Sequence, residues 1–254
     1  MKITFLGTGT SQGVPIIGCT CPVCTSPNKK DNRLRCAILV QVGDTNIVID
    51  SGPDFRYQML RAHVNKLDAI VFTHGHKDHV AGLDDVRAYN YFQQKAMPIY
   101  ATLETQATLK REFSYVFDNP NYPGIPQLEL ITIDGDKPFN VCGVEIQPIR
   151  VKHYYMEVLA FRIGDFTYIT DANYIAPEEL DKVRGSNTVV LTALRHEKHP
   201  SHFTLAESIA IATDLAPEHT YFTHISHQLG LHNEVNQTLP AGMHLAYDGL
   251  ELEF

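Results

Sequence analysis

A heptapeptide rich in metal-binding side chains, Thr73-His74-Gly75-His76-Lys77-Asp78-His79, constrains what this chain can fold into more than any other segment. It follows an apolar run at residues 68–72 that predicts a buried strand. Imidazole is a ligand of zinc, iron or manganese, and a carboxylate adds charge that favours a second divalent ion. Three imidazoles and a carboxylate at the exit of one strand are hard to explain by packing. The heptapeptide therefore predicts a metal site, in which Lys77 has no assigned role.

Apolar runs and helical periodicity alternate along both halves of the 254-residue chain. Strands are predicted at residues 2–6, 37–42, 46–50, 69–72, 98–100, 128–133, 144–151, 158–163, 167–170, 188–191, 220–223 and 244–246. Helices are predicted at 54–63, 102–117, 177–183 and 204–215, the last with a capping box formed by Thr204 and Glu207. The strands form antiparallel-looking runs between helices. We therefore expect an α/β fold in which two mixed sheets pack face to face with helices outside, as one domain over residues 1–254.

Charge and the length of the apolar runs narrow the classes of function. The net charge of −8 disfavours extended nucleic-acid binding, because contacts to phosphates require Lys and Arg. No run approaches the roughly 18 apolar residues of a membrane span. The N-terminal apolar stretch is too short for a signal peptide. We expect a cytoplasmic protein with a small substrate and no membrane partner, and a homodimer remains open.

Three further polar residues lie at the ends of predicted strands. His153, Asp171 and His224 each come shortly after an apolar run, as His74 does. Each one alone would more often be an ordinary loop residue. Because a metal site in the heptapeptide needs more ligands, their shared position makes them candidate ligands.

This order of ligands, His-x-His-x-Asp-His followed by His, Asp and His, resembles the metallo-β-lactamase superfamily of dinuclear hydrolases. Gly7-Thr8-Gly9-Thr10, Asp50-Ser51-Gly52 and Thr223-His224-Ile225-Ser226-His227-Gln228 resemble further landmarks of that superfamily. Within it, the chain most resembles the phosphodiesterase branch that acts on a phosphoribosyl 1,2-cyclic phosphate in phosphonate breakdown. The resemblance spans nearly the whole chain and implies an αββα sandwich.

The resemblance also implies how the ligands are divided between two divalent ions, which zinc, manganese or iron could supply. One ion would be held by His74, His76 and His153, and the second by Asp78, His79 and His224, with Asp171 bridging both. Two ions about 3.5–4 Å apart would activate a hydroxide for attack on phosphorus. Asp50 is similar to the aspartate that orients a ligand imidazole in the family.

The leaving oxygen of a phosphodiester needs a proton, and His202 is the candidate donor. Together with Asp78, it is one of two predicted catalytic residues. An imidazole near its ordinary pKa suits that role. An exposed loop histidine is the alternative, and Arg195 could bind phosphate or be structural. Residues 192–199 depart from the phosphonate enzyme, which leaves the substrate open.

A second group of candidate ligands lies in the loop Gly18-Cys19-Thr20-Cys21-Pro22-Val23-Cys24. Three thiolates need one more ligand to close a tetrahedral zinc site. By resemblance, that ligand is His227, which gives a structural zinc; free reduced thiols are the alternative. Cys36 and Cys142 are predicted to be small core residues.

The sequence thus predicts a metal-dependent hydrolase that cleaves a small cyclic or linear phosphodiester. The alternatives are a thioester- or lactone-type metallohydrolase and a nuclease that processes the 3′ end of transfer RNA. The nuclease normally carries a protruding basic arm, and no insertion of that kind is found. A role in binding metal without catalysis comes last, because all seven ligands of the dinuclear site are present.

Overall fold

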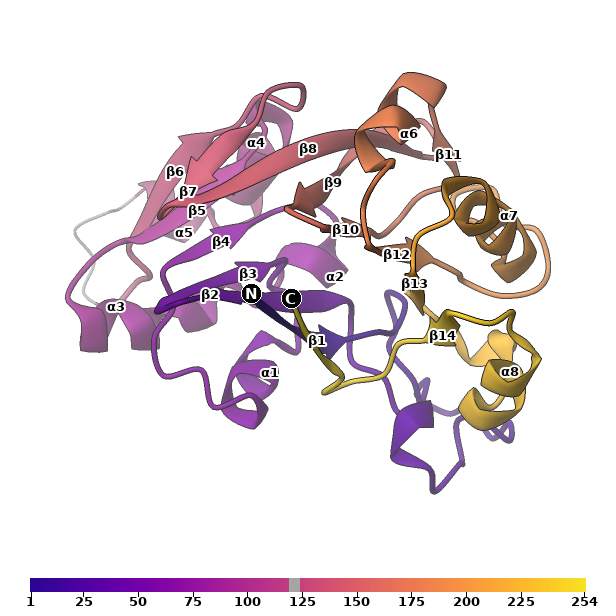
Figure 1. Cartoon of the computed structure of the whole chain (residues 1–254). Helices are drawn as coiled ribbons and strands as arrows, with labels where there is room; N and C mark the ends of the chain where they lie inside the picture. Colours follow the sequence, from indigo (N-terminus) through magenta and orange to yellow (C-terminus); the bar gives the residue numbers. More distant parts are fainter. Residues whose placement is uncertain (119–123) are drawn as a thin grey trace.

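The computed structural model describes residues 1–118 and 124–254, and these form two β-sheets that pack face to face between outer helices (Figure 1). The first sheet has the strand order β15 (Glu251–Glu253), β1 (Lys2–Gly7), β2 (Ala37–Val42), β3 (Thr45–Ile49), β4 (Ala69–Val71), β5 (Met97–Ala101) and β6 (Leu128–Thr132). The second has the order β11 (Tyr174–Ile175), β8 (Val144–His153), β9 (Met156–Ile163), β10 (Phe166–Ile169), β12 (Thr188–Thr192), β13 (His219–Thr223) and β14 (Met243–Leu245), and β7 (Phe139–Val141) pairs with β8. The two termini meet where β1 pairs with β15.

The α-helices of the described residues are α1 (Phe55–Arg61), α2 (Lys77–Val80), α3 (Arg87–Gln93), α4 (Leu103–Glu112), α5 (Ser114–Asp118), α6 (Pro177–Val183), α7 (Leu205–Leu215) and α8 (His232–Thr238). Three short 3₁₀ turns are η1 (Lys29–Asp31), η2 (Leu83–Val86) and η3 (His227–Leu229). At the start of α7, the Thr204 hydroxyl accepts a hydrogen bond from the Glu207 amide, and the Glu207 carboxylate accepts one from the Thr204 amide. The predicted capping box is confirmed.

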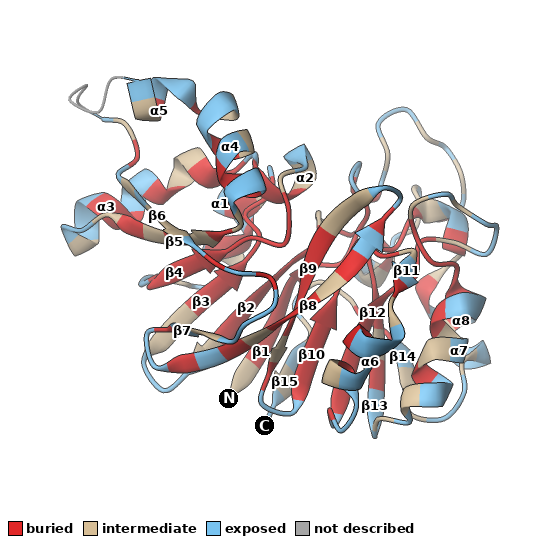
Figure 2. Cartoon of the chain, turned by 90° about the horizontal axis from the view of Figure 1, so that it is seen from above, coloured by how far each residue is buried: buried red, intermediate tan, exposed pale blue. Residues whose placement is uncertain are grey.

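Alternation of side chains along the strands builds the layers. In β2, Ile38 and Val40 pack into a core between the two sheets, whereas Ala37 and Leu39 pack into a core beneath the helices of the first sheet. A third core lies between the second sheet and its helices. Figure 2 shows buried residues along the strands and exposed ones on the outer faces of the helices. The predicted α/β architecture of two mixed sheets with helices outside is confirmed.

The expectation of antiparallel runs is wrong for the strands of each sheet that lead into the predicted metal ligands. β3, β4, β5 and β6 are parallel neighbours, as are β10, β12, β13 and β14. Parallel neighbours need crossover connections, and helices such as α1 and α7 lie in those connections. As a result, the carboxyl ends of neighbouring strands reach the same edge of their sheet.

Several local predictions differ from the structure. The segment predicted as one helix at 102–117 is interrupted at Phe113 and forms α4 and α5. Cys36 is buried as expected, but Cys142 is exposed, because it lies with Gly143 in the tight turn between β7 and β8, where both residues have positive φ. The Pro- and Asn-rich stretch at 118–126 predicts a loop, of which residues 119–123 lie outside the described residues. In the described chain, no helix combines the length and apolar character needed to cross a membrane. A single domain over the whole chain stays a prediction.

Candidate metal centre

The predicted ligands of the dinuclear site meet at the carboxyl ends of strands from both sheets. His74 follows β4, and His79 lies in α2 directly after it. His153 is the last residue of β8 and not a loop residue, whereas Asp171 and His224 follow β10 and β13. A backbone hydrogen bond of 3.1 Å from the Leu159 amide to the Thr73 carbonyl joins the two sheets beside this edge. The sheet pairing therefore gathers residues that lie up to 150 positions apart, counted from His74 to His224.

Asp171 lies between two imidazoles and contacts both. Its Oδ2 is 3.1 Å from Nε2 of His79, and its Oδ1 is 3.1 Å from Nε2 of His224. Asp78 Oδ2 lies 3.3 Å from the same nitrogen of His79 and 3.9 Å from that of His224. One donor atom from each of these four residues lies within 4.8 Å of every other. This is the separation expected of ligands that share one ion.

Asp50 and Thr73 determine the tautomers of two of the imidazoles. Nδ1 of His79 lies 2.7 Å from Asp50 Oδ2 and donates to it. The Thr73 hydroxyl donates to the same carboxylate at 2.8 Å and accepts from Nδ1 of His74 at 2.9 Å. Since the proton of each ring is on Nδ1, Nε2 of each ring keeps a free lone pair that can bind a metal.

His153 has its tautomer determined in the same way from the second sheet. Its Nδ1 donates to the Ser201 carbonyl at 2.8 Å, which leaves Nε2 free. The ring centroid of His153 lies 5.2 Å from that of His76 and 5.8 Å from that of His74. His76 is exposed at the first residue before α2. The three histidines predicted to hold one ion therefore surround a common space that opens to solvent at His76.

His202 lies among these ligands and is 8% exposed, so the alternative of an exposed loop histidine is wrong. Its ring centroid is 4.5 Å from that of His153 and 4.6 Å from that of His224. Its Nδ1 is 3.9 Å from Asp171 Oδ1 and has no hydrogen-bond partner among the described residues. Burial and the nearby His224 lower the pKa of His202 to about 2, so the expectation of an imidazole near its ordinary pKa is wrong. One donor atom of His202 also groups with those of His153 and Asp171, so the geometry does not separate a ligand from a substrate-binding role.

Arg195 is held within its own loop. Its guanidinium donates to the Gln228 side chain at 2.8 Å and to the carbonyls of Glu197 and Lys198. These hydrogen bonds occupy donors on all three of its nitrogens, and they favour the structural alternative over phosphate binding.

The carboxylates and imidazoles of the cluster shift one another's pKa values. Burial raises the pKa of Asp171, but His224 and His79 outweigh it and hold this pKa well below its usual value. Burial lowers the pKa of both imidazoles, but Asp171 and Asp78 outweigh it, raising that of His224 to about 9 and that of His79 well above its usual range. Burial holds the pKa of His74 well below its usual value. A divalent cation at this position would supply the positive charge that the buried carboxylates favour.

The backbone is strained at three residues of the cluster. Asp50, Asp171 and His224 have φ values of 66°, 49° and 56°, in the left-handed region that residues other than glycine rarely adopt. The neighbouring Gly52 cannot be replaced without a shift of the chain, because a Cβ there would lie 2.0 Å from the Asp78 carbonyl oxygen. Strain of this kind clusters at functional sites, where the surrounding structure holds it in place.

The residues present fit a metal ion. Nε2 of His74, His79 and His224 are buried and form no hydrogen bond with any described residue. Buried polar atoms without partners are rare, and those on ligand-type side chains beside carboxylates are accounted for by a cation.

The cysteine loop meets its predicted partner. Sγ of Cys19 and Sγ of Cys21 lie 3.4 and 3.3 Å from Nδ1 of His227, and with Cys24 the four donor atoms are within 4.8 Å of one another. None of these cysteines is in a disulfide. Hydrogen bonds from the Cys24 amide and from His227 lower the pKa of Cys21 to about 6, which favours the thiolate. Three sulfurs and one imidazole are a donor set that closes a tetrahedral zinc site.

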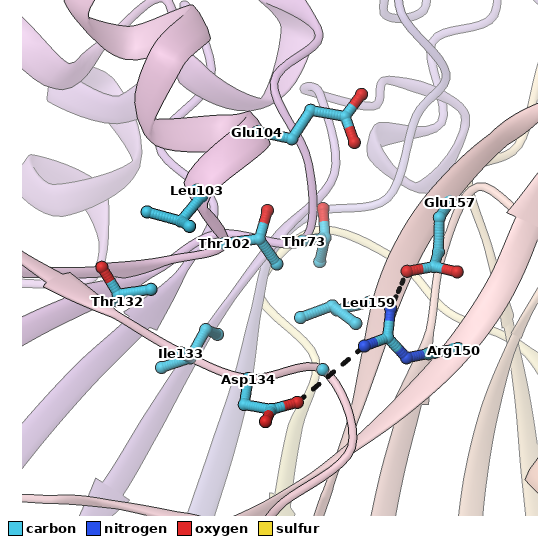
Figure 3. A pocket seen from close by; sticks show the side chains of 11 residues that line it. Thr73, Thr102, Leu103, Glu104, Thr132, Ile133, Asp134, Arg150, Glu157 and Leu159 are labelled. Atoms are coloured by element: carbon cyan, nitrogen blue, oxygen red, sulfur yellow. Dashed lines mark hydrogen bonds and ion pairs between the residues drawn. The ribbon is translucent and has the colours of Figure 1, made fainter.

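A separate cavity of about 470 Å³ lies beside Thr73 (Figure 3), between the ends of β5 and β6 and strands β8 and β9. Its one arginine, Arg150, pairs with Glu157, Asp136 and Asp134. Because carboxylates neutralise that guanidinium, the cavity offers no free cation to a phosphate. Its residues include none of the predicted metal ligands.

Sequence reasoning missed the residues that orient the ligands. Thr73 lies in the heptapeptide, but nothing in the sequence indicates that its hydroxyl links Asp50 to His74. The Ser201 carbonyl that holds His153 has no sequence signal at all, because any residue has a carbonyl.

Comparison with known proteins gives four relevant similarities, from a family model, a solved structure and two sequence relatives. A family model described as a β-lactamase superfamily domain matches residues 45–225. A solved structure described as a new diphosphatase from the PhnP family is 43% identical to this chain with a TM-score of 0.93, and the match covers 100% of this chain and 97% of the other.

Two sequence relatives are longer than the chain. A protein of Porphyromonas gingivalis named octanoyltransferase is 37% identical over 253 residues, which are 99% of this chain and 51% of that protein. A ribonuclease Z of a Bradyrhizobium species is 25% identical over 218 residues, which are 84% of this chain and 61% of that protein. The chain thus spans about half the length of the first of these relatives.

Proposed function

The chain belongs to the metallo-β-lactamase superfamily, and we propose that it is a metal-dependent hydrolase whose substrate is a small cyclic or linear phosphodiester or the phosphoanhydride of a small diphosphate. One observation carries the proposal: the chain is similar over its whole length to a diphosphatase of the PhnP family, at 43% identity. The cluster around Asp171 supports it, because its imidazoles and carboxylates are a donor set that suits the divalent ions used in phosphodiester hydrolysis.

In this proposal, two divalent ions occupy the centre. His74, His76 and His153 would hold one ion, Asp78, His79 and His224 the other, and Asp171 would contact both. When bound, such a pair of ions provides Lewis acidity at phosphorus and a nucleophile from water at neutral pH.

The remaining steps belong to side chains of the chain itself. Asp50 and Thr73 keep the lone pairs of His79 and His74 directed into the centre. His202 has a buried nitrogen without a partner among the described residues and lies beside Asp171, so it is placed to donate a hydrogen bond to the phosphoryl or leaving oxygen. We propose that His202, as a neutral imidazole, donates this hydrogen bond and so stabilises the charge on the leaving oxygen.

The cysteine loop would hold a third, structural ion. We infer a zinc bound by Cys19, Cys21, Cys24 and His227, because the donor set is soft and complete without water. His227 lies three residues after His224, and the Ile225 amide donates to the Thr8 carbonyl at 2.9 Å. The zinc would therefore fasten the N-terminal loop to the segment that carries a ligand of the catalytic centre.

A thioester hydrolase is the second candidate. The relative named octanoyltransferase favours it, since an octanoyl group is commonly carried as a thioester. However, the chain matches only 51% of that protein, so the name of the whole protein is weak support for the activity of the matched part. A nuclease for transfer RNA has weaker support, because the ribonuclease Z relative is 25% identical and the net charge is −8.

The test is a substrate screen of the protein loaded with zinc, manganese or iron. The panel contains bis(p-nitrophenyl) phosphate, a ribose cyclic phosphate, a diester of diphosphate, an octanoyl thioester and a lactone. We expect hydrolysis of the phosphorus esters with a kcat/KM at least tenfold above that for the thioester and the lactone. A preference for the thioester would overturn the proposal and leave the family assignment intact.

A further inference from the structure

Two tyrosines form the tip of the hairpin that carries His153. His153 pairs with Met156 across the β8–β9 ladder, so Tyr154 and Tyr155 are the two residues of the loop. Their exposed fractions are 53% and 82%, large for aromatic residues, and their ring centroids lie 3.8 Å apart with the planes at 52°. Packing into a hydrophobic core does not explain two exposed aromatic rings at this position, which indicates a role in binding.

The backbone at this tip is strained. Tyr154 has φ of 60°, a conformation that a bulky side chain adopts rarely and that glycine usually provides in two-residue hairpin loops. The Tyr154 amide donates to the Asn173 side chain at 2.8 Å, and that side chain donates to the Pro200 carbonyl at 3.0 Å. Asn173 therefore ties the backbone of the hairpin tip to the loop that carries His202.

A cavity of about 450 Å³ lies between these tyrosines and the metal centre. The residues that line it are His76, His153, Tyr154, Tyr155, Met156, Pro200 and Ser201. Two of them are predicted metal ligands, so a group in this cavity can be bonded directly to a phosphoryl group at the centre. Two phenol rings, a thioether and a proline ring line the rest of it.

The charge of this lining selects the kind of group. It contains no Lys, Arg, Asp or Glu from the described part of the chain. A second phosphate would find no cation there, and an ammonium group would find no carboxylate. The lining favours an uncharged planar ring, because tyrosine and methionine contact the faces and edges of aromatic rings well.

We propose that Tyr154 and Tyr155 stack on a nucleobase, and that the substrates of this hydrolase are nucleoside phosphates whose base enters this cavity. The inference rests on the proposed phosphodiesterase function and names its substrate class. Stacking of a base on an aromatic side chain tolerates many bases. The pair Tyr154 and Tyr155, which we call the platform, therefore selects for a base without selecting which one.

The first test measures binding by isothermal titration calorimetry with the metal-loaded full chain. Adenosine 5′-monophosphate is compared with ribose 5-phosphate, which has the same sugar phosphate without the base, and with octyl phosphate. We expect the adenosine compound to bind about tenfold more tightly than ribose 5-phosphate. Equal affinities, or tighter binding of octyl phosphate than of the adenosine compound, would overturn the platform.

Variants locate the effect. Tyr155→Ala should remove the advantage of the adenosine compound and leave the affinity for ribose 5-phosphate unchanged. Tyr154→Gly removes the other ring and relieves the backbone strain at a positive φ, so this variant should fold at least as well as the wild type. It should also lose the tighter binding of the adenosine compound. The control is Tyr174→Ala, a tyrosine in β11 with the same exposed fraction of 53% that does not line the cavity. If Tyr155→Ala and Tyr154→Gly both keep the advantage, the platform is wrong.

A kinetic comparison separates this inference from the function on which it rests. The methyl ester of adenosine 5′-monophosphate and the methyl ester of ribose 5-phosphate contain the same phosphodiester linkage. If the wild-type protein cleaves both with equal kcat/KM, the phosphodiesterase function holds and the platform falls. If it cleaves neither, the phosphodiesterase function falls, and the calorimetric comparison still decides whether a base is bound.

Discussion

The two candidate metal sites of this molecule are built in opposite ways. The histidine and aspartate cluster lies at the ends of strands from both sheets, is largely buried, and has the tautomers of His74, His79 and His153 determined by hydrogen bonds. The cysteine cluster joins one N-terminal loop to His227, is half-buried, and has contacts among its sulfurs, the His227 imidazole and backbone amides. The first cluster has its ligands oriented by buried side chains of both sheets, whereas the second depends on a single loop and one distant imidazole.

This difference suggests what each site can do. A catalytic centre needs free coordination positions and a rigid frame, so that the substrate and not the protein completes the coordination. A structural site uses all four positions for the protein and contributes the binding free energy to folding. Removing one ligand from each site should therefore affect different properties of the molecule.

The largest effect is expected from Asp171→Asn, which tests the buried cluster alone. Asp171 contacts both His79 and His224, so its loss should reduce turnover more than the 10–100-fold that loss of an outer hydrogen-bond partner typically causes. The measurement is kcat for bis(p-nitrophenyl) phosphate with metal content by mass spectrometry. Asp165→Asn, at an exposed carboxylate between β9 and β10, is the matched control. Full turnover in the Asp171 variant would show that the cluster is not the catalytic centre.

His202→Ala separates catalysis from metal binding within the same cluster. If His202 donates a hydrogen bond to the leaving oxygen, kcat should fall by about 100- to 1,000-fold while the metal content stays that of the wild type. Kinetics and metal analysis on the same preparation check this, with the exposed His219→Ala as control. Loss of an ion together with activity would make His202 a ligand, and unchanged turnover would remove it from the mechanism.

Thr73→Val tests whether the fixed tautomer matters. It removes the hydroxyl between Asp50 and His74 and keeps the shape of the side chain. Metal affinity or kcat should fall by about 10- to 100-fold, the usual cost of losing an outer partner of a ligand. Thr73→Ser retains the hydroxyl and should behave like the wild type. Equal behaviour of the two variants would show that the hydroxyl does not orient His74.

Cys21→Ser tests the cysteine cluster and should leave turnover nearly unchanged at low temperature. We expect the loss of one tightly bound zinc and, for a destabilisation of about 2 kcal/mol, a decrease in Tm of roughly 4–8 °C. Differential scanning calorimetry and metal analysis measure both. Cys142→Ser, at an exposed cysteine outside the cluster, should change neither. Retention of all metal by the Cys21 variant would favour free thiols in this loop.

Particular residues show which features of the fold and site follow from local sequence and which do not. The capping box at Thr204 and the run of His74 to His79 are local patterns, and local patterns predicted them. The parallel order of β10, β12 and β13 was not predicted, because strand neighbours depend on contacts distant in sequence. The exposure of Cys142 was wrong for a similar reason: a two-residue turn interrupts what reads as a continuous apolar run.

By itself, the sequence determined the chemistry of the donors: imidazoles and carboxylates in one set, thiols in the other, and their order along the chain. Only the tertiary structure decided which atoms face one another. The pairing of sheets brought Asp171 against both His79 and His224, and the hairpin between β8 and β9 placed Tyr154 beside the ligands. Side-chain chemistry is a property of each residue, whereas distances between remote residues depend on the register and direction of every strand between them.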